Sequence, residues 1–128
     1  MKYPIGICIW SNEIFVCDNF NHRICVFGLA GNYIKSFGSK GNKNNQFKYP
    51  SYIYIDGERI YICDTHNHRI QIYDMGFVYV STIGGEGEGN AHGQFNYPLG
   101  ITIGADNLLY ICDYNNNQIG RASCRERV

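Results

Sequence analysis

The fold of this chain is decided by a short stretch of sequence that occurs three times. Residues 63–74 read CDTHNHRIQIYD, residues 17–24 read CDNFNHRI, and residues 112–119 read CDYNNNQI. The Cys-Asp pairs are 46 and 49 residues apart, and a Tyr-Pro pair recurs at residues 3–4, 49–50 and 97–98 with spacings of 46 and 48. Such a period marks a repeat architecture. The chain therefore holds two units and the start of a third.

The composition favours strands over helices. Among the 128 residues are 17 isoleucines and 11 tyrosines but four leucines and four alanines, and β-branched and aromatic residues suit a pleated sheet. Eleven basic residues balance eleven acidic ones. This balance argues against a strongly basic nucleic-acid-binding surface and against a strongly acidic tail. No apolar run is long enough to cross a bilayer. We therefore expect one all-β domain.

Each complete unit is predicted to form four short strands. We expect them near residues 5–10, 13–18, 23–27 and 33–37, then near 52–55, 59–63, 69–73 and 78–83. The third unit shows two, near 100–103 and 108–112. Both faces of these strands are largely apolar, which indicates sheets covered on both sides. Four-stranded sheets repeated at this period and packed face to face describe a β-propeller.

The repeated residues resemble the NHL repeat. The shared series is Pro-Ile-Gly-Ile at residues 4–7, Cys-Asp at 17–18, Asn-His-Arg-Ile at 21–24, Phe-Gly at 37–38 and Gln-Phe at 46–47. The resemblance implies a partial NHL-type β-propeller of four-stranded antiparallel blades with an incomplete ring. It divides the chain into blade one with its connection at residues 1–48, blade two at 49–96 and a partial blade three at 97–118. Six blades, common in the family, would need roughly 280 residues at this repeat length.

The last ten residues depart from the repeat. Residues 119–128 read IGRASCRERV, with three arginines and no strand pattern. They resemble, at every position, the translation of a short-read sequencing adapter. We expect a non-native tail and exclude it from fold reasoning; the alternative is a native basic C-terminus. Without this tail the chain carries eight basic and ten acidic residues (11 − 3 and 11 − 1), a net charge of −2, and five cysteines.

Polar residues that follow each Cys-Asp pair are predicted to be structural. They can satisfy the backbone amides of their own turn, and a packed blade must pair its buried polar groups. The set comprises Asp18, Asn21, His22, Arg23, Asp64, Asn67, His68, Arg69, Asp113 and Asn116. The alternative for the two histidines is a metal site, since neutral imidazole is a common ligand. Their equivalent places in successive repeats favour structure, and we expect no metal and no cofactor.

Four lysines are candidate RNA contacts. They are Lys35, Lys40, Lys43 and Lys48. Because aromatic residues are interleaved with them, the stretch could hold single-stranded RNA by phosphate contacts and stacking. We favour a solvated lysine face over a packed aromatic core. Residues 86 and 88 of the second connection are glutamates, which argues against a continuous positive face.

The cysteines are expected to be free thiols. Cys17, Cys63 and Cys112 occupy one recurring position, which is typical of a small packing residue, and five native cysteines cannot all pair. The N-terminus lacks the apolar stretch of a signal peptide. We therefore favour a cytoplasmic protein with buried, unpaired cysteines.

The expected function is non-catalytic binding, because no nucleophile and base can be paired from the sequence. In the family that the chain resembles, such propellers often end larger chains, including tripartite-motif ubiquitin ligases in which the propeller selects the partner. We expect a protein–protein interaction module with a protein partner, no membrane and no small-molecule substrate. Two alternatives stay open. One is an RNA-binding NHL propeller, and the other is a zinc enzyme like the peptidyl-α-hydroxyglycine lyase, whose histidine ligands we cannot map onto this sequence.

Overall fold

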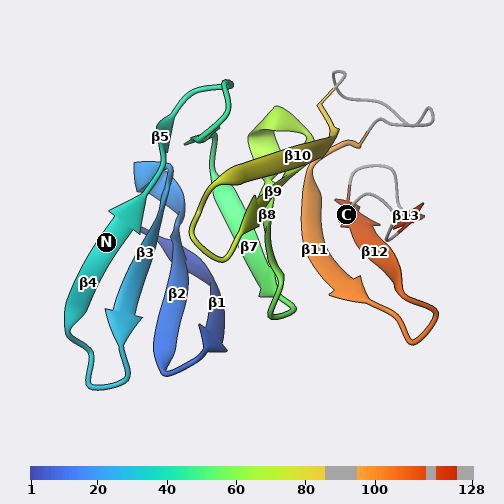
Figure 1. Ribbon diagram of the computed structural model, residues 1–128. Coiled ribbons are helices and arrows are strands. Elements are labelled where there is room, and N and C mark those ends of the chain that lie inside the picture. Colours follow the sequence, from blue (N-terminus) through green and yellow to red (C-terminus); the bar gives the residue numbers. More distant parts are fainter. Residues whose placement is uncertain (86–94, 115–117, 124–128) are drawn as a thin grey trace.

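Three antiparallel sheets follow one another across the molecule, each built from one repeat of the sequence (Figure 1). The computed structural model describes residues 1–85, 95–114 and 118–123. Strand order within each sheet equals chain order, so every pair of neighbouring strands is joined locally. In these described ranges no helix is long and apolar enough to span a membrane.

The strands match the predicted repeat closely. The first sheet contains β1 (Pro4–Trp10), β2 (Glu13–Asp18), β3 (Arg23–Gly28) and β4 (Tyr33–Phe37). The second contains β7 (Pro50–Ile55), β8 (Arg59–Asp64), β9 (Arg69–Asp74) and β10 (Tyr79–Gly84), and the third β11 (Pro98–Ile103), β12 (Leu108–Asp113) and β13 (Gln118–Ser123). Sequence reasoning missed the 3-10 turns η1 (Asn19–Asn21) and η2 (Thr65–Asn67), and the short parallel pair β5 (Ser39–Lys40) and β6 (Gln46–Phe47).

The prediction of two strands in the third unit is wrong, because β13 pairs with β12. Backbone groups along an open strand edge can bond to a neighbouring segment whatever its side chains are, so residues without a strand pattern can still pair there. The register continues the repeat. Asp113 stands opposite Gln118, as Asp64 stands opposite Arg69 in the second sheet. β13 thus crosses the expected boundary at residue 118.

The register also shows where the repeat fails. Arg121 stands opposite Tyr110, at the place where the second sheet pairs Ile72 with Tyr61. Ile72 is fully buried against the third sheet, whereas no following blade covers the third sheet within the described residues. The burial of Ile72 therefore sets no cost on an arginine in β13, and the non-native origin of residues 119–128 stays a prediction.

The hydrophobic core lies between successive sheets. One buried cluster joins the first sheet to the second, including Phe15 and Ile53, and another joins the second to the third, including Tyr61 and Ile111. The second sheet is therefore covered on both faces, as predicted. Ile7 of β1 is 64% exposed whereas its equivalent in β7, Ile53, is 2% exposed. Packing against a neighbouring blade is what buries this position.

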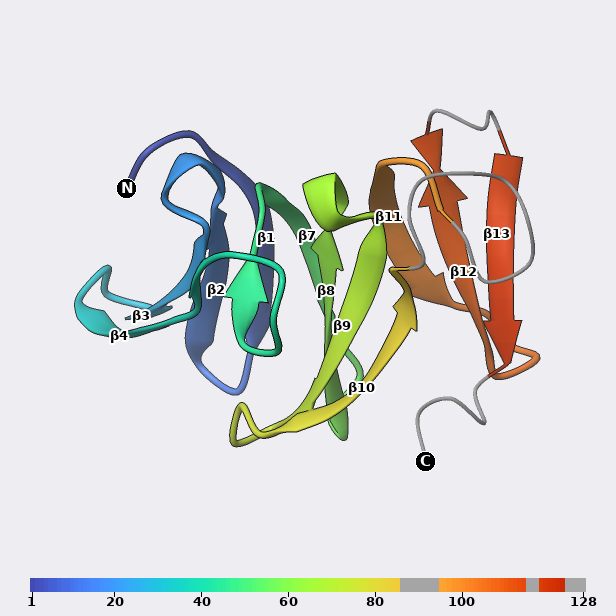
Figure 2. The same ribbon diagram turned by 90° about the horizontal axis from the view of Figure 1, so that it is seen from above.

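The first strands of the three sheets converge. β1 contacts β7 and β7 contacts β11. In the view from above these three strands lie side by side, and the later strands of each sheet spread away from them (Figure 2). Sheets that fan out from their first strands are the arrangement of propeller blades. This convergence brings the beginnings of all three repeats together at one end of the molecule.

Candidate functional site

The end of the molecule at which the first strands begin is here named the turn face. It comprises residues 2–5, 18–23, 38–51, 64–69 and 95–99. η1 and η2 follow β2 and β8 there. The backbone amides of Phe20 and His66 donate to the carbonyl oxygens of Lys2 and Lys48, each at 3.0 Å. These bonds tie each 3-10 turn to the residues that open the same blade. The opposite end carries the β1–β2, β7–β8 and β11–β12 hairpins.

A buried carboxylate braces the turn in the first blade. Asp18 Oδ1 accepts from the Lys2 amide at 2.6 Å, and Oδ2 accepts from Asn21 Nδ2 at 3.0 Å and from Arg23 Nε at 2.8 Å. Burial would raise the pKa of Asp18, but these three donors and the charge of Arg23 outweigh it and hold the pKa below its usual value. The carboxylate therefore stays ionised and holds the strand start to the turn.

The second blade repeats this arrangement. Asp64 accepts from the Lys48 amide at 2.7 Å, from Asn67 Nδ2 at 2.9 Å and from Arg69 Nε at 2.7 Å. In the third blade Asp113 accepts from the Asn96 amide at 2.6 Å; Asn116 lies outside the described residues. The repeated bonds support the structural interpretation of these polar residues, which stays a prediction.

The two histidines of the motif join one blade to the next. His22 and His68 both have φ near +54° and end the 3-10 turns in the left-handed region. His22 Nδ1 accepts from the Tyr49 amide at 3.0 Å, and His68 Nδ1 accepts from the Tyr97 amide at 3.2 Å. An imidazole nitrogen can accept only when it carries no proton. Each histidine thus acts as a neutral acceptor for the blade that follows it.

The two arginines of the motif differ in their surroundings. Arg69 Nη1 donates to the Asn42 carbonyl at 3.0 Å, and Nη2 donates to the Lys43 and Gln46 carbonyls at 2.9 and 3.0 Å. Its side chain is 10% exposed, against 36% for Arg23. Arg69 therefore holds the connection between the first two sheets in addition to its own turn.

A row of five aromatic side chains crosses the turn face and is here named the aromatic row. Its members alternate between Tyr-Pro pairs and 3-10 turns: Tyr3, Phe20, Tyr49, His66 and Tyr97. Successive ring centroids are 4.7, 5.5, 4.5 and 5.0 Å apart, which is the range of favourable ring contacts. Phe20 is 46% exposed. The first pair is stacked and the other three are edge-on or tilted, so the row is a continuous series of ring contacts that spans all three blades.

The tyrosines of the row adopt an unfavourable backbone conformation. Tyr3, Tyr49 and Tyr97 have φ of 61°, 55° and 58°. The left-handed region costs an L-residue roughly 1–2 kcal/mol. The histidine acceptors described above hold the amides of Tyr49 and Tyr97. Strain that recurs at equivalent positions of a surface motivates a functional hypothesis for that surface.

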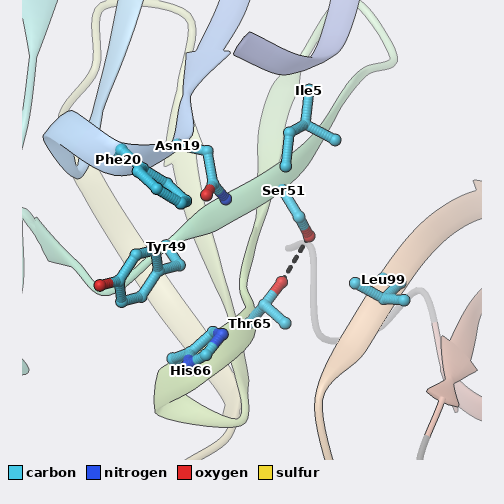
Figure 3. A pocket seen from close by; sticks show the side chains of 8 residues that line it. All are labelled: Ile5, Asn19, Phe20, Tyr49, Ser51, Thr65, His66 and Leu99. Atoms are coloured by element: carbon cyan, nitrogen blue, oxygen red, sulfur yellow. Dashed lines mark hydrogen bonds between the residues drawn. The ribbon is translucent and has the colours of Figure 1, made fainter. Parts of the chain in front are cut away.

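A hollow of about 390 Å³ lies beside the aromatic row, between the three first strands (Figure 3). Its lining residues are Ile5, Asn19, Phe20, Tyr49, Ser51, Thr65, His66 and Leu99. Burial lowers the pKa of His66, and nearby His68 and Lys48 lower it further. The imidazole is therefore neutral near pH 7, and the lining carries no charge there.

The turn face and the opposite hairpin end differ in the charged side chains that they carry. The turn face carries the exposed lysines Lys2, Lys40, Lys43 and Lys48, and its two aspartates, Asp18 and Asp64, are buried. The opposite hairpin end carries five acidic residues and two basic ones, Lys35 and Arg59. Of the acidic residues, Glu58 and Asp106 are exposed and Glu13, Asp56 and Asp74 are partly buried. The two glutamates of the second connection lie outside the described residues.

The structure groups three of the four candidate RNA lysines and separates the fourth. Lys40, Lys43 and Lys48 belong to the connection at the turn face, and the charges of Lys40 and Lys48, after burial, lower the pKa of His22. Lys35 Nζ instead lies 5.3 Å from the ring centroid of Phe77, in the β9–β10 hairpin.

The cysteines that the structure describes are all free thiols. Cys17 and Cys63 are fully buried between sheets, and burial raises the pKa of both thiols. Cys112 is exposed, so the expectation of burial is wrong at this position: it lies on the third sheet, where no following blade covers it within the described residues. Over the same part of the chain no group of three or more His, Cys, Asp or Glu side chains could hold a metal ion.

Face-to-face four-stranded sheets that fan out from their first strands define a β-propeller. The comparisons agree: the profile of a family described as 6-bladed beta-propeller matches residues 1–84, and the NHL repeat profile matches residues 95–121. The chain belongs to the 6-bladed beta-propeller family and is an NHL-repeat propeller fragment. The NHL match runs three residues into the segment expected to be non-native.

Several known proteins are similar to this chain in sequence or in structure. RING finger protein nhl-1 of Caenorhabditis elegans is 40% identical over 42 residues, which are 32% of this chain and 4% of that protein. A chain of the nidogen/laminin complex has a TM-score of 0.69 at 20% identity, covering 98% of this chain and 46% of that one. Virginiamycin B lyase from Staphylococcus aureus has a TM-score of 0.64 at 14% identity, covering 92% and 37%. The chain spans less than half of each, and the two structural likenesses show the fold alone.

Proposed function

We propose that this chain is part of a non-catalytic propeller that binds a protein partner on its turn face. The observation that carries the proposal is the aromatic row, in which five rings from three blades form one accessible surface on a rigid scaffold. Aromatic side chains are enriched in protein interfaces, and recognition commonly uses loops held by such a scaffold.

The titratable groups of the turn face support a binding role over catalysis. Asp18 and Asp64 each accept three hydrogen bonds from their own turn and strand start. His22 and His68 accept backbone amides with Nδ1. Groups that make such hydrogen bonds stabilise the local structure, whereas a general acid or base must reach a substrate.

We further propose that the parent protein is a tripartite-motif-like ubiquitin ligase whose propeller selects the partner. The support is the 40% identity to a RING finger protein. The likeness to a lyase at 14% identity supports the fold only, and lyase activity is not part of the proposal. RNA is the second candidate ligand, favoured by Lys40, Lys43 and Lys48 on the same face as the aromatic row, because lysines beside exposed aromatic rings suit single-stranded nucleic acid.

Site-specific photo-crosslinking in the complete protein tests the proposal. Phe20→benzoylphenylalanine places the probe in the aromatic row, and Val78→benzoylphenylalanine places it at an exposed position of the opposite end. Irradiation in cells should give discrete protein adducts at position 20 that are absent at position 78. Equal adducts at both positions, or none at position 20, would refute the turn face as the protein-binding site. Nucleic-acid adducts at position 20 would favour the second candidate.

A further inference from the structure

We infer that the turn face binds an acidic polypeptide segment that inserts one branched aliphatic or aromatic side chain into the hollow between β1, β7 and β11. This inference rests on the proposed function and adds the chemistry of the partner. Three independent features carry it: the apolar wall of the hollow, the hydrogen-bonded state of its polar groups, and the separation of charge between the two ends.

The wall of the hollow is apolar where it is accessible. Ile5 of β1 and Leu99 of β11 are exposed and face the space from two different blades, and the Phe20 ring bounds it from η1 (Figure 3). Exposed apolar side chains that converge on one concavity are typical of interaction sites. A single aliphatic or aromatic side chain would remove all three from water.

Three polar side chains that border the hollow, those of Asn19, Ser51 and Thr65, already have hydrogen-bond partners. Asn19 Nδ2 donates to the Pro50 carbonyl at 3.0 Å. The Ser51 and Thr65 hydroxyls are hydrogen-bonded to each other (dashed in Figure 3), and Thr65 Oγ1 also donates to the Pro98 carbonyl at 2.8 Å. A polar ligand group inserted there would lose its water without gaining these donors, which is unfavourable. An apolar group loses nothing and gains from burial.

The residues around the hollow favour an anionic segment. Lys2 and Lys48 immediately precede Tyr3 and Tyr49 of the aromatic row, and both lysines are exposed. The charge of Lys48 reaches His66 in the lining. The described acidic residues at this end are buried, and at the opposite end five acidic residues outnumber Lys35 and Arg59. An acidic segment is therefore attracted to the turn face more than to the opposite end.

The same features favour a polypeptide over RNA. Ile5 and Leu99 offer branched aliphatic surfaces, on which a base cannot stack as it does on a ring. Lys35, which would extend the lysine track, points instead to the Phe77 ring at the far end. The aromatic row then forms one side of the docking site, and the hollow supplies the anchor.

Selection from a random peptide display library on the immobilised complete protein tests this inference. Enriched peptides should combine glutamate or aspartate with one Leu, Ile, Phe or Tyr. For the most enriched peptide, made synthetically with a fluorescent label, Ile5→Ser and Leu99→Ser should each weaken binding about tenfold, because an apolar contact is lost. Lys48→Glu should weaken it about fivefold at low salt, and less at about 0.5 M salt.

Matched controls come from the opposite end and the opposite face. Val78→Ala truncates an exposed apolar side chain, and Lys35→Glu reverses the charge of an exposed lysine that lies away from the turn face. Both substitutions should leave the affinity for the peptide unchanged. Because Ile5 and Leu99 are tested separately and each is exposed, a folding defect in one variant leaves the other informative.

Several results would overturn the inference. These are enrichment of basic or purely polar peptides, no enrichment at all, or binding that survives both Ile5→Ser and Leu99→Ser. Enriched peptides that show no acidic and apolar preference, but whose binding is lost on Phe20→Ala, would overturn this inference and leave the proposed function standing. If no peptide is enriched, but a labelled polyuridine RNA binds and Lys48→Glu abolishes that binding, the inference is overturned in favour of RNA.

Discussion

The Asp-Arg pairs of the first two blades allow a comparison within one molecule. The sequence motif is the same, but Arg69 donates to Asp64 and to three backbone carbonyls of residues 42–46 with 10% of its side chain exposed. Arg23 donates to Asp18 with 36% exposed. Replacement of each arginine by methionine keeps most of the aliphatic stem and removes the charge. The two substitutions should therefore differ in cost because of the burial of the arginine and of its bonds to the connection.

The magnitudes follow from these surroundings. Both aspartates are fully buried, so the difference lies in the arginines. Arg69→Met removes a cation that is 10% exposed together with its three bonds to carbonyl oxygens, and breaking such a buried pair costs about 3–5 kcal/mol. Arg23→Met removes a bond from a partly solvated guanidinium, which is worth about 1 kcal/mol after solvent screening. Arg69→Lys restores a cation near Asp64 but not the fork that reaches three carbonyls, so its cost should fall between the two.

Two measurements on the complete protein check this prediction. Urea unfolding should give a free-energy loss at least about 2 kcal/mol larger for Arg69→Met than for Arg23→Met. Native-state hydrogen exchange should accelerate at residues 41–47 in Arg69→Met and stay unchanged there in Arg23→Met. Equal losses of stability, or unchanged exchange at residues 41–47 in both variants, would refute the reasoning that the connection depends on Arg69.

Four other predictions can be checked with simple measurements. Burial lowers the pKa of His22, so the unfolded chain takes up the proton at a higher pH than the folded chain. The free energy of unfolding should therefore fall as the pH drops below about 6.5. The fall should be smaller in His22→Asn, in which asparagine tolerates the left-handed backbone and does not titrate. Cys63→Ala should cost on the order of 1 kcal/mol, and native thiol labelling should leave Cys63 unmodified while mass analysis shows no disulfide. Residues 1–117 expressed alone should aggregate or melt without cooperativity, because end blades expose apolar faces; a soluble monomer with a sharp melt would contradict this. Genomic DNA should contain no codons for residues 120–128 after Asn117, and an in-frame match to that segment would make the tail native.

Most of the fold could be predicted from the sequence because its signals are local. Strand limits follow from apolar runs and turn residues, and β2 and β4 match the expected ranges exactly as residues 13–18 and 33–37. β13 could not be predicted, since edge pairing depends on open backbone groups and on geometry more than on side chains. The expected burial of Cys112 failed for a similar reason, because burial depends on what covers a sheet.

The candidate site was predictable in its parts and not as a whole. The repeated polar motif was visible, and Asp18 and Asp64 do lie beneath the turns. The recurrence of Tyr-Pro was visible too, but nothing local indicated that its tyrosines would contact histidines of the preceding blade. The aromatic row was therefore missed, although its members stand in the same repeated segments.

The sequence by itself determined the repeat, the strands within it, the propeller class and the residues that brace each turn. These follow from periodicity and from bonds that span a few residues. Only the tertiary structure decided that His22 holds Tyr49 across 27 residues, that the connection of residues 38–48 covers Arg69, and that three first strands enclose a hollow (Figure 3). The physical reason is that blade-to-blade packing sets these distances. A motif with the same letters is half-exposed in one blade and buried in the next according to its neighbour.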